Sequence, residues 1–110
     1  MIDERIQRIE AAVQTAGDIP AERKAEVLGL LAQLRTGIGA LSETHGEDAD
    51  SIARLAETSA HEATRSSKEP GLLESALRGL QQSVQGYEAS HPEMVETVNR
   101  YATSLANMGL

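Results

Sequence analysis

The 110-residue chain contains no cysteine, tryptophan or phenylalanine, and it has only two tyrosines. Without cysteine, disulfide bridges and thiolate zinc sites are excluded. Cations are also scarce, because 10 Lys and Arg stand against 17 Asp and Glu and the formal net charge is −7. Since neutralising phosphate groups requires a surplus of cations, we expect no nucleic-acid partner.

Long hydrophobic runs are absent as well. No stretch approaches the roughly 18 apolar residues of a membrane span, and the early charges of Asp3 and Glu4 do not fit a signal peptide. We therefore expect no membrane partner, a cytoplasmic location by default, and a single domain over residues 1–110. Leu, Ile and Val number only 23, so their placement decides whether a core forms.

That placement is helical. Apolar residues recur every three or four positions, as in the stripe formed by Ile2, Ile6, Ile9, Val13 and Ala16. The spacing predicts a helix over 2–16, a first helical hairpin over 20–66 and a second over 70–107. Because no segment alternates with a period of two, we predict an all-α bundle of about five helices.

The two hairpins match each other when the sequence is shifted by 46 residues. The run 45–47 (His-Gly-Glu) then aligns with 91–93 (His-Pro-Glu), and Arg54 aligns with Arg100. Amphipathicity does not require these matches, so we interpret them as a duplicated helix–turn–helix unit. Two similar but unrelated amphipathic hairpins are the alternative.

Both aligned junctions carry a capping-box pattern, a hydroxyl residue followed three positions later by Glu. Thr44 with Glu47, and Ser90 with Glu93, are therefore predicted to start new helices directly after the preceding ones. The apolar register nevertheless continues through the first junction. One long kinked helix over 20–66, in an intertwined dimer, is the alternative architecture.

Four runs in the chain are distinctive: Ser51–Ala53, His61–Arg65 (His-Glu-Ala-Thr-Arg), Glu88–Glu93 and the tail Leu105–Leu110 (Leu-Ala-Asn-Met-Gly-Leu). Together they resemble a family of short bacterial proteins of unknown function. The resemblance covers most of residues 20–110 and implies a small, helical, cytoplasmic protein from a bacterium. It implies no activity, and no catalytic residue carries over from it.

The two junction histidines are candidates for chemistry. His45 and His91 are interpreted either as a ligand pair or pH-sensitive corner, or simply as residues that begin a helix. Glu88 precedes His91 by three positions, the spacing used in di-iron bundles, so a metal-binding bundle is one alternative function. Because Ser42 occupies the matching position in the first hairpin, half of such a site is missing. We expect no metal and no cofactor.

A second alternative function centres on His61. With Arg65 one turn later in an acidic helical bundle, it resembles the phosphorylated histidine and nearby cation of histidine phosphotransfer domains. In those domains the cation usually stands three positions along, so the match departs from the pattern. The simpler interpretation is a solvated face on which Glu57, His61 and Arg65 interact at i,i+4 spacing.

Our leading prediction is a non-enzymatic protein–protein interaction or structural module with an acidic surface for a protein partner. Short helices with an Ala-rich third member bury a modest area, and a symmetric dimer would cover what one chain leaves exposed. We therefore expect a homodimer. The tail Met108–Leu110 is expected to dock on the bundle, with contact to a partner as the alternative.

Overall fold

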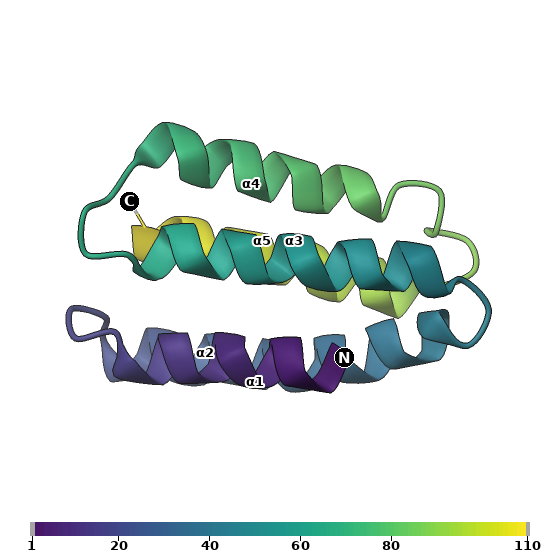
Figure 1. Ribbon diagram of the computed structural model, residues 1–110, viewed down its shortest axis with the longest axis horizontal. Helices are drawn as coiled ribbons and strands as arrows, with labels where there is room; N and C mark the ends of the chain where they lie inside the picture. Colours follow the sequence, from purple (N-terminus) through teal and green to yellow (C-terminus); the bar gives the residue numbers. More distant parts are fainter. Residues whose placement is uncertain (1, 110) are drawn as a thin grey trace.

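Five helices make up the chain in the computed structural model, which describes residues 2–109 (Figure 1). They are α1 (Ile2–Thr15), α2 (Ala21–Ser42), α3 (Gly46–Thr64), α4 (Pro70–Ser83) and α5 (Pro92–Gly109). The predicted all-α bundle is confirmed over these residues. None of the helices within 2–109 combines the length and the apolar character needed to cross a membrane.

The helices pack in three layers, with α1 and α2 in the first, α3 and α5 in the second, and α4 in the third (Figure 1). The central helix α3 contacts all four others. Its buried positions are dominated by one small residue type, at Ala49, Ala53, Ala56, Ala60 and Ala63. Small side chains let neighbouring helices approach closely, so the Ala-rich face of α3 is what permits its central place.

The alternative of one long helix over 20–66 is wrong, because the chain reverses between Ser42 and Gly46. His45 leaves the helical region, with φ −135° and ψ 65°, and α3 packs back against α2. Predicted helix ends differ by one or two residues. The helices predicted to end at 16 and 66 end at Thr15 and Thr64, where the next residue, Arg65, is already extended.

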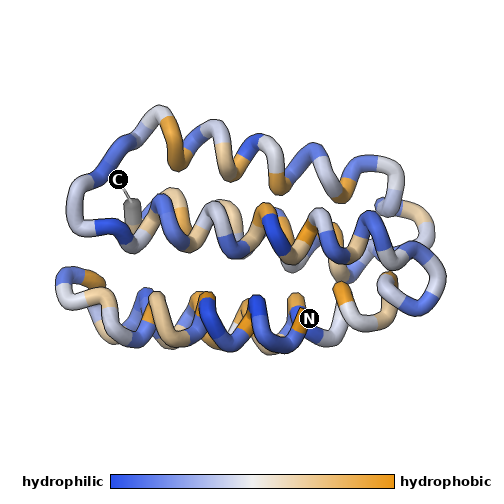
Figure 2. The backbone as a smooth tube through the Cα atoms, viewed as in Figure 1, coloured by the Kyte–Doolittle hydropathy of each residue, from blue (hydrophilic) through white to orange (hydrophobic). Residues whose placement is uncertain are grey.

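The core is built from the predicted stripes. Leu73, Leu77 and Leu80 of α4 are buried on the side of that helix that faces α3 and α5 (Figure 2), whereas Leu72 is exposed. The fully buried hydroxyl of Tyr101 on α5 donates to the backbone oxygen of Ala56 on α3 over 2.8 Å. At the C-terminal tail, Met108 packs against the core, whereas Leu110 lies outside the described residues.

Local contacts repeat with the predicted offset of 46. The backbone amide of His45 donates to the backbone oxygen of Leu41, and that of His91 donates to the backbone oxygen of Tyr87, in matching positions of the two hairpins. The ion pair of Arg54 with Asp50 recurs in the same way as the pair of Arg100 with Glu96. The second hairpin differs at its turn. Helix α4 ends at Ser83, earlier than a shift of 46 from the end of α2 at Ser42 would place it. Gly86 in this turn adopts φ 98°, a conformation that favours glycine.

Candidate functional site

Both helix junctions lie at the same end of the bundle, and Tyr87 joins them (Figure 1). Its ring meets the imidazole of His45 edge-to-face, with 5.5 Å between ring centroids, and that of His91 with 5.7 Å. The Tyr87 hydroxyl donates to the Asp48 carboxylate, and this hydrogen bond is the main cause that raises the pKa of Tyr87. The two histidines weighed from the sequence therefore share one aromatic neighbour.

The capping box predicted at the first junction, Thr44 with Glu47, is wrong. The N-cap of α3 is His45 and not Thr44, and no side-chain cap bond forms. Instead the Thr44 hydroxyl lies 2.8 Å from His45 Nδ1. Thr44 stands one residue before the N-cap, so Glu47 does not complete a capping box with it. At the second junction the structure shows the same arrangement, because the Ser90 hydroxyl lies 3.0 Å from His91 Nδ1.

Helix α5 begins at Pro92, so Ser90 also lies one residue too early for a box with Glu93. The nearby Glu88 stabilises the turn, since both of its carboxylate oxygens accept from the Gly86 backbone amide at 3.1 Å. Neither Glu88 nor His91 belongs to a group of three or more His, Asp or Glu residues arranged for a metal ion within the described residues. The Glu-x-x-His spacing of Glu88 and His91 is therefore not completed by a second set of metal ligands within the described residues.

His61 and Arg65 lie toward the other end of α3. The His61 side chain is exposed, and the Arg65 guanidinium bonds to Glu62 over 2.9 Å. Both residues line a hollow of about 620 Å³ that also includes Thr15 of α1. The hollow places a histidine and an arginine at one surface, but the cation is already neutralised by Glu62.

The predicted interaction of Glu57 with His61 is wrong. The Glu57 carboxylate instead accepts from Arg5 Nη1 over 2.8 Å and from Arg8 Nε over 2.6 Å, both on α1. The hydrogen bond from Arg8, followed by that from Arg5, lowers the pKa of Glu57 against the opposing effect of burial. This carboxylate therefore fastens α1 to α3 and takes no part in a site around His61.

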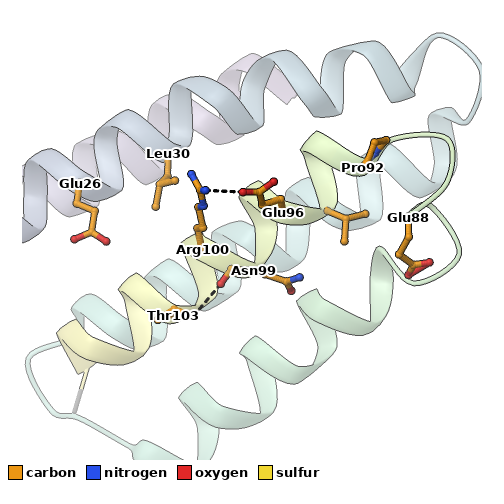
Figure 3. A pocket seen from close by; sticks show the side chains of 9 residues that line it. Glu26, Leu30, Glu88, Pro92, Glu96, Asn99, Arg100 and Thr103 are labelled. Atoms are coloured by element: carbon orange, nitrogen blue, oxygen red, sulfur yellow. Dashed lines mark hydrogen bonds and ion pairs between the residues drawn. The ribbon is translucent and has the colours of Figure 1, made fainter.

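A groove runs between α2 and α5, which lie antiparallel (Figure 3). Its main section has a volume of about 670 Å³ and continues into a section of about 370 Å³, and the two sections share Glu96 and Arg100. Leu30, Pro92 and Val95 supply apolar surface in the main section. We call the two sections together the α2–α5 groove.

Carboxylates dominate the α2–α5 groove. Its lining contains Glu26 on α2, Glu88 in the turn, and Glu93 and Glu96 on α5. The one cation among the lining residues, Arg100, forms an ion pair with Glu96 (Figure 3). This groove could not be predicted from the sequence because it depends on which helices become neighbours, and residues on opposite walls, such as Gln33 and Thr97, are 64 positions apart.

The solvent side of α2 forms a second distinctive surface. Five exposed residues follow one another along it at helical spacing, namely Ala25, Gly29, Ala32, Thr36 and Ala40. We call them the outer face of α2. None carries a charge, and a Cβ added at Gly29 would meet no atom within 4 Å. Packing within the chain therefore does not account for glycine at this position.

A model of a domain family described as a domain of unknown function, DUF4404, matches residues 27–110. The matched segment contains most of α2 and all of α3, α4 and α5, and so includes both junctions and the α2–α5 groove. Comparison with curated proteins finds no match, and comparison with solved structures finds none either.

Proposed function

The chain belongs to the DUF4404 family of domains of unknown function, and we propose that it is a non-enzymatic helical interaction module that associates with itself. The outer face of α2 is the observation that carries this proposal. A bacterial cytoplasm is the proposed location; its bacterial part rests on the sequence resemblance, and its cytoplasmic part also on the early charges of Asp3 and Glu4.

The outer face of α2 is unlike the solvated faces of α1 and α5. Charged residues form 25% of the chain, and exposed positions of α1 and α5 carry Glu4, Arg8, Glu96 and Arg100. The outer face of α2 has alanine, glycine and threonine instead. Small uncharged side chains let a second helix approach closely without desolvating a charge. In a chain of net charge −7, such a face is where two copies meet with least repulsion.

A homodimer packed through α2 is the expected form in solution, because a two-fold axis buries the same face on both copies. Light scattering coupled to gel filtration measures it directly. We expect a mass of twice 11.8 kDa for the natural chain at micromolar concentration. Ala32→Glu places a charge in the middle of the outer face, and we expect it to give the monomer mass.

Ala11→Glu is the matched control, because Ala11 is an exposed alanine on α1, away from the outer face. We expect it to retain the dimer mass. Circular dichroism melting shows whether both variants stay folded. A natural chain with the monomer mass, or equal masses for the two variants, would contradict self-association through α2.

A further inference from the structure

We propose that the α2–α5 groove binds a basic amphipathic helix supplied by another protein. This inference rests on the proposed function as an interaction module and names the chemistry of its partner. The occupant is inferred from three properties of the groove on one surface: its length, its apolar floor and its acidic rim.

The length and floor fit a helix. Along α2 the groove extends from Glu26 to Gly37, which is about three helical turns or roughly 17 Å. At its narrow end α2 and α5 come very close, since a Cβ added at Gly37 would lie 3.1 Å from Met94 Cβ. Farther along, the half-buried Val95 and the almost fully buried Leu30 line the groove between the walls. One apolar stripe of a helix is the shape that covers such a floor.

The rim selects a basic partner. Four carboxylates and one guanidinium line the groove, so negative charge is in excess although Glu96 is paired with Arg100 and Glu26 lies 3.9 Å from Arg23 Nη1. A partner with Lys or Arg beside its apolar stripe would meet Glu26 on one wall and Glu93 on the other. A second copy of this chain brings a net charge of −7, so like-charge repulsion opposes it in the groove. Self-association through the outer face of α2 and partner binding in the groove use neighbouring surfaces, which adjoin at Thr36.

The probe for the test is a fluorescent peptide of about 18 residues, long enough to form a helix, with the repeating pattern Leu-Lys-Lys-Leu. Fluorescence polarisation should show saturable binding that weakens as salt screens the charges. Two further peptides separate the contribution of the positive charges from that of the apolar stripe. One has Glu in place of every Lys, and the other has Ser in place of every Leu. We expect neither to bind, because the first is repelled by the rim and the second lacks the apolar stripe.

Matched variants locate the site. Glu26→Gln with Glu93→Gln removes one carboxylate from each wall, and we expect binding about five- to tenfold weaker, as for two partly exposed ion pairs. Glu4→Gln with Glu69→Gln removes the same charge from exposed positions outside the groove, and we expect unchanged binding. In amide NMR spectra, the shifts caused by the peptide should cluster at residues 26–37 and 92–103.

Equal weakening by both double variants, or amide shifts outside the groove, would overturn the proposal. Absence of peptide binding would overturn it as well. If the amides of the α5 wall, residues 92–103, shift when the concentration of the protein alone is raised, a second copy occupies the groove and the basic-helix proposal is wrong. The mass by light scattering reports separately on self-association, so a dimer that binds no peptide removes this inference and leaves the proposed function standing.

Discussion

At the scale of single residues, Tyr101 shows how one polar atom is buried in an apolar core. The side chain has no exposed surface, and its hydroxyl donates to Ala56 on α3. Burial is the main cause that raises the pKa of Tyr101 far above its ordinary value of 10.0, with a smaller effect from the negative charge of Glu57. The hydroxyl therefore keeps its proton as long as the bundle is folded.

Tyr101→Phe should lower the free energy of unfolding by about 1 kcal/mol at neutral pH, because one buried hydrogen bond is lost. The raised pKa makes the proton more tightly held in the folded state. The natural chain should therefore lose stability above pH 10.0, by about 1.4 kcal/mol per pH unit. Urea unfolding across this range should give a shallower decline for Tyr101→Phe than for Tyr87→Phe. Parallel declines would show that Tyr101 ionises without unfolding.

At the scale of elements, α1 is held on α3 by its apolar stripe and by a shared carboxylate. Glu57 of α3 receives hydrogen bonds from both Arg5 and Arg8 of α1, and about a quarter of its side chain is exposed, at 27%. These bonds favour the ionised carboxylate and lower its pKa. The stability they contribute is present above the unfolded pKa of 4.5 and is lost as the pH falls through the lowered value.

Glu57→Gln should therefore lower the free energy of unfolding by about 1 kcal/mol at pH 7, allowing for solvent screening of Arg8. The difference from the natural chain should shrink as the pH falls below the ordinary value of 4.5 and through the lowered pKa of Glu57, because the natural carboxylate becomes protonated. Glu74→Gln is the control, since its pair with Arg78 is exposed on both sides and should be worth under about 0.5 kcal/mol. Urea unfolding at several pH values measures both. A constant difference at all pH values would mean that charge plays no part.

The elements themselves could be predicted well from the sequence, and their contacts could not. Periodicity placed the helices, and Gly17, Pro20 and Pro70 stand at the breaks between them, where glycine and proline end or begin helices through local backbone chemistry. The partner of Glu57 was missed because the i,i+4 rule considers only the residue's own helix, whereas the nearest cations belong to α1. The capping boxes failed by one residue, since a pattern of spacing does not fix which residue leaves the helical conformation.

The outer face of α2 and the α2–α5 groove also could not be predicted, because sequence patterns do not give the contacts between helices. The buried stripe containing Leu31 and Leu34 was evident in the sequence, but the exposure of Ala32 and Gly29 depends on which sides of α2 are covered by α1, α3 and α5. The α2–α5 groove likewise exists only once α5 has returned beside α2. Tertiary placement therefore decides the candidate site, although the residues that line it are ordinary helix-surface residues.

At the scale of the whole molecule, α1 raises the question of how many cooperative units the chain has. The family model matches residues 27–110 and does not include α1. Yet Ile6, Ile9 and Val13 are buried against the rest of the bundle, and α1 contacts both α2 and α3. This burial predicts that α1 and the matched segment unfold together as one domain.

Ile9→Ala tests that prediction, because it removes buried volume from α1 alone and should cost roughly 2–4 kcal/mol. If the chain is one cooperative unit, hydrogen exchange of the slowest amides in α5 should accelerate by the amount that corresponds to this loss, although α5 does not contact α1. Gln7→Ala, at an exposed position of the same helix, should change exchange little, by under about 0.5 kcal/mol. Faster exchange in α1 with unchanged α5 amides would instead identify α1 as a separate unit docked on the family domain.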